Sequence, residues 1–582
     1  MTARALLAML AVLAASICDV AAQEAVLTRQ AAEYRTETPK TILELQQFRQ
    51  TTVAPIGGTS SLIGTARLIN LSPRNNGWYL LTLDWGKSGG TTSYHLENPV
   101  PALQTLRLGE DGFDIVSGES AIHCSLWSSA GQSALETARH SGLPYAPLCA
   151  GRLYLRNPVS GSVTNLELTT DFLRDHVWGG DRLVGYARQL FYRDVFLQRG
   201  APGLAAGKSE PTPDPDAPRP ALLDPAKTHA AVVPVDLGID LGRPAGTLLP
   251  GRWYPVAGEA GIYFSFLQPQ IIAAGILASH RDRVNDLDAV EAPALDYLVA
   301  FDLARFDVGF VLGTDHPRVD WSDRPPDAAR RGLPGPDGIG TAAPLVTNGM
   351  LSPSLVPRAI ATFAGGFKRR HGAFKYGAFA QSNHGSHYGF IEQGVVFSKL
   401  QPGLATLYVL DDGSIGMRSW SEQDNVLLDR IRFARQNGVA LVEQAPATGE
   451  PVPGALVNQW GPGNWSGTAD EQLRSVRSAL CLAETASRRF LVYGYFSAAT
   501  PSAMARVLQA YGCRYAFHLD MNALEHTYLA LYFHRGAQIA VQHLVSGMAN
   551  IDKKSGAAMA PRFLAYPDDR DFFYLTRKGV EP

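Results

Sequence analysis

The sequence is poor in cysteine, carries almost no net charge and has no long apolar run after its first 22 residues. Its 582 residues contain 52 Lys and Arg against 54 Asp and Glu, with the two signs interspersed, so the formal net charge is −2. This balance indicates neither a basic surface for nucleic acid nor an acidic tail. Because no later segment is apolar over the roughly 18 residues that a membrane span requires, no span is predicted in the mature chain.

The cysteines are too scattered for a zinc knuckle, and we expect neither a metal nor a cofactor. Four of them, Cys124, Cys149, Cys481 and Cys513, remain outside the N-terminal segment and permit three disulfide pairings in an oxidising compartment. Pairing within each half of the chain, Cys124 with Cys149 and Cys481 with Cys513, would add one bridge to each half. Four buried free thiols are an equally weighted alternative, and the sequence leaves both open.

Residues 1–22 resemble an export signal peptide. Arg4 gives a positive start, residues 5–17 form an apolar segment, and the small residues 20–22 offer a cleavage site. One alternative is an uncleaved anchor, for which about 13 apolar residues are too few. Another is a lipoprotein modified at Cys18, where the preceding Ile17 is a poor fit. The mature chain is therefore predicted to be secreted, and a bacterial periplasm fits best.

With 46% apolar and 18% charged residues the chain is globular, and its length indicates several domains. Residues 23–58 are expected to form a helical or mobile lead-in. Residues 59–200 read as a β-rich domain, a sandwich or jelly roll of short alternating strands, which ends in a helix over about 171–198. Residues 201–227 are rich in proline and are expected to form an extended linker, followed by a second domain over 228–582.

Three tryptophans of the β-rich domain raise the question of sugar binding. Trp78, Trp85 and Trp127 would stack on sugar rings if the domain were a carbohydrate-binding module. Tryptophan is highly buried on average, so a place in the sandwich core is favoured for each of them.

The second domain is predicted to be α/β or α+β, with a mixed sheet that contains a βαβ unit. Residues 488–496 and 514–519 are strand-like, and residues 500–511 have a capping Thr500, a proline in the first turn and one apolar face. Two strands joined by such a helix are expected to be parallel and connected right-handedly.

Polar residues follow the second of these strands in the stretch "HLDMNALEH", residues 518–526. Because ligands of open α/β sheets bind beyond the carboxyl ends of strands, Asp520, Asn522 and Glu525 are candidates for a site. Upstream, Gly365 and Gly366 precede Lys368 and would let backbone N–H groups and positive charge approach an anion together.

The order of several short segments resembles the phosphodiester glycosidase family, the catalytic domain type of the enzyme that uncovers mannose 6-phosphate. The similar segments are "AGGF" (364–367), "VLDDGSI" (409–415), "RQNGVALVE" (435–443), "VRSAL" (476–480) and "YAFHLD" (515–520). The resemblance covers roughly 290–535. It departs where the family has Asn and this chain has Ala364, and where the family has glycines and this chain has residues 521–524.

The resemblance implies hydrolysis of a sugar 1-phosphodiester, and roles for several residues follow from it. Arg477 would clamp the phosphate, because a guanidinium matches two phosphate oxygens. Asp520 would act as nucleophile, base or stabiliser of the oxocarbenium ion, with Glu525 as a second acid. The residues expected to contact the substrate are Asn522, His526, Asn437, Gly365, Gly366 and Lys368.

Three functions are therefore considered. The first is an exported hydrolase acting on phosphate-linked envelope or extracellular glycans. The second is a non-catalytic glycan-binding or envelope structural protein on the same fold, since larger residues replace the family's glycines. The third, a metal-dependent hydrolase, would require His384, His387, His526 and Asp520 to converge, and it is the weakest. His518 lies inside an apolar strand and is expected to be a core residue.

Overall fold

The fold comes from a computed structural model. It describes residues 39–58, 61–86, 89–128, 133–165, 167–169, 172, 194–202, 214–228, 231–244, 248–321, 332, 334–369, 387–459, 464–465, 471–536, 538–555 and 558–579. Outside them lie the predicted signal peptide, the first part of the lead-in, most of the predicted helix 171–198, and residues 203–213 of the linker. Among the described residues, no helix combines the length and apolarity needed to cross a bilayer.

The N-terminal domain consists of two antiparallel sheets that share a core containing Phe113 and Trp127. Short alternating strands produce it because each buries one face against the other sheet. Its six-stranded sheet, in spatial order, contains β1 (Gln50–Gly58), β2 (Ser61–Asn70), β3 (Trp78–Asp84), β4 (Thr91–Glu97), β9 (Leu153–Arg156) and β8 (Tyr145–Leu148). The three-stranded sheet contains β5 (Thr105–Leu108), β6 (Gly112–Ser117) and β7 (Ser120–Ser125), and α2 (Ala134–Arg139) follows.

The C-terminal domain is built around an eight-stranded antiparallel sheet and two five-stranded antiparallel sheets. The large sheet contains, in spatial order, β12 (Tyr254–Pro255), β13 (Ile262–Leu267), β14 (Asp296–Asp302), β25 (Arg489–Ala499), β24 (Ser475–Glu484), β26 (Cys513–Met521), β22 (Ala440–Gln444) and β23 (Pro451–Pro453). The helices α5 (Ala274–Ala278) and α7 (Pro501–Ala510) contact each other, and α7 packs on this sheet.

The second sheet contains β15 (Phe306–Val311), β31 (Phe572–Arg577), β16 (Ala359–Ala364), β27 (Leu529–Arg535) and β28 (Gln538–His543). The third contains β18 (Val395–Ser398), β17 (Phe390–Glu392), β21 (Ile431–Gln436), β19 (Ala405–Leu410) and β20 (Ile415–Ser419). Two short pairs complete the strands: β10 (Ala201–Pro202) with β11 (Val232–Val233), and β29 (Lys553–Ser555) with β30 (Ala558–Ala560).

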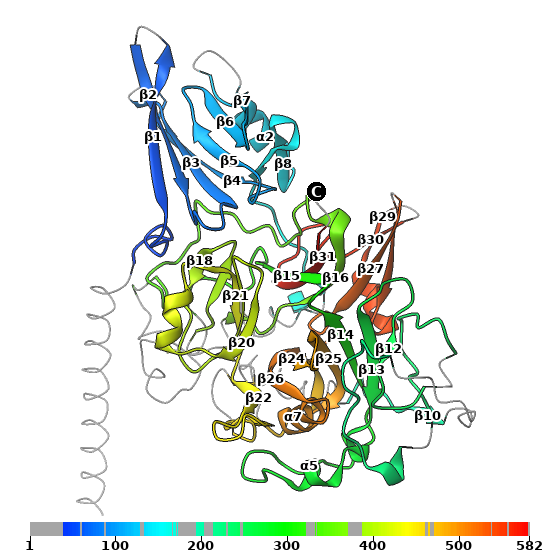
Figure 1. The fold of residues 1–582 in the computed structure, drawn as a ribbon. Helices are drawn as coiled ribbons and strands as arrows, with labels where there is room; N and C mark the ends of the chain where they lie inside the picture. The colour runs from blue at the N-terminus through cyan, green and yellow to red at the C-terminus, as the bar shows by residue number, and fades with distance from the viewer. Residues whose placement is uncertain are drawn as a thin grey trace, which may run out of the picture.

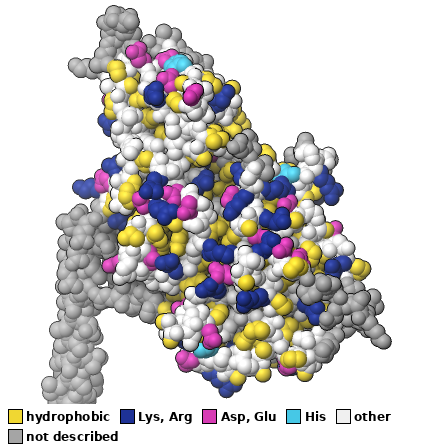
Figure 2. Space-filling view, in the orientation of Figure 1, with side chains coloured by type: hydrophobic (Ala, Val, Ile, Leu, Met, Phe, Trp, Pro, Cys, Tyr) yellow, Lys and Arg dark blue, Asp and Glu magenta, His cyan; other side chains and the backbone are white. Residues whose placement is uncertain are grey.

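The two domains lie against each other, with the blue and cyan N-terminal strands at one end of the molecule (Figure 1). The rings of Trp78 and Phe397 meet edge to face at 6.1 Å across this contact. The Gln46 amide also exchanges hydrogen bonds with the backbone of Val396. Over the visible face, positive and negative side chains are mixed, as the balanced composition predicts (Figure 2).

Of the expectation of an α/β or α+β domain with a mixed sheet, the mixed sheet is wrong, because every ladder of the large sheet is antiparallel. The local elements of the predicted βαβ unit are present as β25, α7 and β26, and Thr500 caps the helix. However, β24 lies between β25 and β26 and pairs antiparallel with both. Residue periodicity predicts the elements, whereas insertion of an earlier strand between them depends on the whole sheet.

The expectations for the lead-in and the linker need adjustment, whereas the favoured burial of the tryptophans is confirmed for two of them. The end of the lead-in is strand β1, and Ile42 and Leu45 are buried in the main core. In the linker, residues 214–227 lie on the C-terminal domain, where Leu223 packs against the core around α7. Of the tryptophans, Trp78 and Trp127 are buried and cannot stack on a sugar from solvent.

Both cysteine pairs form disulfides, Cys124–Cys149 and Cys481–Cys513, which confirms pairing within each half of the chain. The second bridge joins β24 to the start of β26 and spans 32 positions.

Replacing Cys481 and Cys513 together by alanine is expected to lower the free energy of unfolding by about 3–4 kcal/mol, because the closed loop restricts the unfolded chain. Chemical denaturation of the oxidised wild type and of the double variant would measure this. An unchanged transition midpoint would contradict a stabilising role for this bridge.

Candidate functional site

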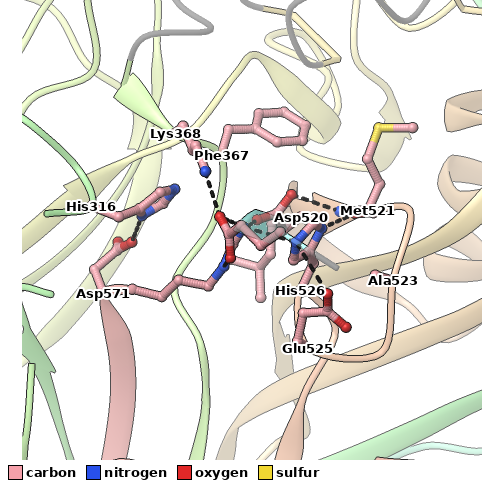
Figure 3. A network of polar contacts seen from close by, with 12 residues as sticks. His316, Phe367, Lys368, Asp520, Met521, Ala523, Glu525, His526 and Asp571 are labelled. Carbon is pink, nitrogen blue, oxygen red and sulfur yellow. Dashed lines mark hydrogen bonds and ion pairs between the residues drawn. The ribbon is translucent and has the colours of Figure 1, made fainter. Parts of the chain in front are cut away.

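Asp520 lies at the end of β26 and is the centre of a buried polar cluster (Figure 3). One carboxylate oxygen accepts a hydrogen bond from its neighbour's backbone, Met521 N, at 2.8 Å. The other accepts from Arg570 Nη1, also at 2.8 Å. Asp520 is 7% exposed, so it is nearly buried and lies just beneath the protein surface.

Arg570 connects Asp520 to Glu167 and to His526, and Glu167 in turn contacts Lys368. Its Nε and Nη2 atoms donate to both carboxylate oxygens of Glu167, at 3.1 and 2.7 Å. Nη2 also donates to His526 Nε2 at 2.8 Å, while His526 Nδ1 lies 2.6 Å from the Met521 carbonyl oxygen. Only the tautomer with the proton on Nδ1 satisfies both contacts, because Nε2 must accept. Lys368 forms a further ion pair with Glu167.

Burial and the neighbouring charges divide the acids of this cluster into two kinds. Burial raises the pKa of Asp520 to about 7, although Arg570 and the Met521 N–H act in the opposite direction. Burial, reinforced by Glu167, raises the pKa of Asp569 to about 8. Burial also opposes ionisation of Glu167, but Arg570 and Lys368 outweigh it and hold its pKa well below the ordinary value. The site therefore pairs a permanent carboxylate with two acids that titrate near neutral pH.

The turn after β26 places two of the other predicted residues at the rim of the cluster. The Glu525 carboxylate accepts a hydrogen bond from Thr164 Oγ1 at 3.2 Å and lies 4.0 Å from His526 Nε2. Asn522 has a positive φ of 81°, and its side-chain oxygen accepts from Ser475. Asparagine tolerates this conformation better than most residues.

The backbone of Gly365 and Gly366 lies close to the cluster, and Asn437 holds the loop that contains them. Asn437 Oδ1 accepts from Phe367 N at 2.8 Å, and its amide nitrogen donates to the Leu519 carbonyl at 2.6 Å. Asn437 is fully buried, so it ties this loop to the end of β26 instead of binding a substrate hydroxyl.

Gly366→Ala is expected to destabilise the protein by about 1–3 kcal/mol, because φ is 137° and a Cβ would lie 2.9 Å from the Asn437 side chain. Gly275→Ala in α5 is the matched control. A Cβ there meets nothing within 4 Å, and we expect it to stabilise by up to about 1 kcal/mol. Thermal unfolding of both variants tests the pair, and equal shifts would contradict the close approach at Gly366.

Arg477 is not placed as a phosphate clamp. Its guanidinium is completely buried and donates to the carbonyl oxygens of Ala499 and Leu473 at 2.8 and 2.7 Å. These bonds hold the segments on either side of β24, so a structural role replaces the predicted one. His518 is buried beside Phe367, as expected for a core residue.

The histidines of the metal hypothesis do not meet in the described structure. His387 belongs to a separate buried group, where it contacts Ser398 and Gln401 and lies 3.5 Å from Asp337. Arg369, which follows Lys368, is bound to the same aspartate. His384 lies outside the described residues, and within the described ranges no group of three or more His, Cys, Asp or Glu has a metal-binding arrangement.

Sequence reasoning missed half of the cluster, namely Glu167 and the segment 568–571. Four consecutive charged residues, Asp-Asp-Arg-Asp, stand directly before the buried strand β31. Three acids and an arginine next to an apolar strand were a signal that the charges are buried and paired. The structure shows that Asp568 holds Arg562, Arg570 holds Asp520 and Glu167, and Asp571 holds Arg435.

Comparison with known proteins adds two solved structures of very low similarity. A hypothetical protein from Synechocystis matches with 11% identity and a TM-score of 0.23, over 86% of this chain and 97% of that one. A protein described as exported, from Burkholderia pseudomallei K96243, matches with 10% identity and a TM-score of 0.17, over 87% of this chain and 99% of that one. No family model and no curated protein matches.

Proposed function

We propose that this chain is an exported hydrolase of the phosphodiester glycosidase type, which cleaves phosphate-linked glycans of the bacterial envelope or its surroundings. The observation that carries the proposal is Asp520, an acid with a pKa of about 7 at a strand end beside Arg570 and Lys368. Near neutral pH it can be ionised to attack or to accept a proton.

The proposed reaction is the cleavage of the bond between the anomeric carbon of a sugar and its phosphate. Attack on the anomeric carbon, by Asp520 or by a water that Asp520 deprotonates, breaks the bond between that carbon and the phosphate oxygen. If Asp520 itself attacks, water then hydrolyses the resulting glycosyl ester and restores the carboxylate. The phosphate leaves with the electron pair and needs neutralisation more than protonation. Lys368, whose side chain is 15% exposed against 3% for Arg570, is the more accessible cation of the cluster and takes the role first assigned to Arg477.

A second candidate is a non-catalytic glycan-binding protein on the same fold. One observation favours it: Glu167 already forms ion pairs with both Arg570 and Lys368, which reduces the positive charge left for a phosphate.

Turnover of chromogenic N-acetylglucosamine 1-phosphodiesters by the mature protein tests the two functions against each other. Formation of free N-acetylglucosamine together with the intact aryl phosphate supports the hydrolase, because the proposed step breaks the bond on the sugar side of the phosphate. Glycan binding without turnover across a panel of sugars would overturn it in favour of the binding protein.

A further inference from the structure

His316 forms a second polar group beside the Asp520 cluster (Figure 3). It follows β15, and its Nδ1 lies 2.6 Å from Asp571 Oδ1. The other oxygen of Asp571 accepts from Arg435 Nε at 2.7 Å. His316 is 2% exposed, and Asp571 and Arg435 are also buried. The imidazole is therefore held in one orientation by a fixed ion pair.

The contacts also define which ring nitrogen carries the proton. Burial opposes ionisation of Asp571, but Arg435 and His316 outweigh it and hold its pKa below the ordinary value. An ionised carboxylate only accepts hydrogen bonds, so the proton of His316 lies on Nδ1. Burial, together with the charges of Arg570 and Lys368 outside the dyad, lowers the pKa of His316 to about 4 against the effect of Asp571. At neutral pH, Nε2 is an acceptor.

This acceptor has no hydrogen-bond partner among the described residues. Buried polar atoms of proteins are nearly always paired, so an orphaned nitrogen on an otherwise fixed ring calls for an explanation. In Figure 3, Nε2 is on the side of the ring nearer Lys368, whose charge acts on it. Because the nitrogen itself is buried, a group that donates to it would have to enter beside Lys368, whose side chain is 15% exposed.

We infer that His316 Nε2 accepts a hydrogen bond from a hydroxyl group of the ligand whose phosphate is bound at Lys368. The inference rests on the proposed function and deepens it, because it requires a hydroxyl close to the phosphate, as in a sugar 1-phosphate. Asp571 and Arg435 act as positioning residues that keep the acceptor nitrogen directed to that hydroxyl.

Two substitutions distinguish the roles of the two ring nitrogens of His316. His316→Asn keeps a donor for Asp571 at the place of Nδ1 and removes the acceptor, whereas His316→Gln keeps an acceptor near the place of Nε2. Calorimetric binding of N-acetylglucosamine 1-phosphate and of inorganic phosphate is measured for the mature wild type and both variants, with thermal unfolding as the check of folding.

We expect His316→Asn to weaken sugar phosphate binding by roughly 5- to 100-fold, the effect of losing one buried hydrogen bond. His316→Gln should restore part of the loss, and inorganic phosphate should bind all three proteins equally. In a panel of monodeoxy sugar 1-phosphates, one analogue should bind the wild type more weakly than the parent sugar by the same factor. His316→Asn should bind that analogue and the parent sugar with equal affinity.

The outcomes distinguish this inference from the proposed function. Sugar phosphate binding that His316→Asn leaves unchanged overturns the role of His316 while the proposed function stands. Absence of sugar phosphate binding by the wild type overturns both. If neither variant folds, the deoxy panel decides with the wild type alone, and equal affinity for every analogue overturns the inference.

Discussion

Asp520→Asn is expected to reduce turnover of a sugar 1-phosphodiester by roughly 10²- to 10⁴-fold, the usual contribution of an acid–base group. The amide can still accept from Arg570 Nη1 or Met521 N, so the variant is expected to fold. A loss of turnover without loss of the folded state would therefore report on chemistry at this carboxylate.

The same assignment predicts how kcat/KM changes with pH. Burial raises the pKa of Asp520 to about 7, so the reactive carboxylate form is lost as the pH falls through 7. The wild-type kcat/KM should rise with pH and level off above that value, whereas residual turnover of Asp520→Asn should lack the inflection.

Glu392→Gln is the matched control, because Glu392 is another buried acid whose pKa is raised, to about 8, by burial. It lies at β17, outside the Asp520 cluster, and its replacement should leave both turnover and the inflection in place. Normal turnover of Asp520→Asn, or an inflection that survives in it, would contradict the assignment.

Arg570→Ala is expected to lower the free energy of unfolding by about 3–5 kcal/mol. The substitution leaves the carboxylates of Glu167 and Asp520 buried beside each other without their shared cation, and an uncompensated buried charge is strongly destabilising. Chemical denaturation at neutral pH measures the change.

The control for this prediction is an ion pair of similar length at the surface. Arg74 Nη1 lies 2.9 Å from Asp411, but its side chain is 55% exposed, so Arg74→Ala should cost no more than about 1 kcal/mol. The double variant Glu167→Gln with Arg570→Met should lose less than Arg570→Ala, since it removes a charge of each sign. Equal losses for Arg570→Ala and Arg74→Ala would mean that the cluster does not depend on its cation.

Much of the local structure was predictable because it depends on neighbouring residues. The helix predicted over residues 500–511, with its capping threonine and its proline in the first turn, is α7 (Pro501–Ala510). The hairpin between β19 and β20 turns at Asp412 and Gly413, and the glycine has the positive φ that such a turn requires. Hydrophobic alternation along β24 places Ala479 and Cys481 in one core and Leu480 in the other.

The candidate site was predictable only in part. Asp520 and Glu525 were found because they follow a strand within a few positions, and Lys368 because it follows two glycines. His526 entered only through the family resemblance. Arg477 was assigned from its residue type, but its donors are used by backbone carbonyls. Glu167 escaped notice because nothing in its own neighbourhood indicates a partner.

Hydrophobic period, capping and turn chemistry act over a few residues, so local sequence is sufficient to predict the strands, the helix α7, the hairpin and the acid at the end of β26. The position of β24 between β25 and β26, and the contact of Glu167 with Arg570, 403 positions away, depend on the folded chain as a whole. Burial is also a tertiary property. It decides that Asp520 titrates near neutral pH and that His316 presents one acceptor nitrogen, because desolvation depends on every segment packed around these groups.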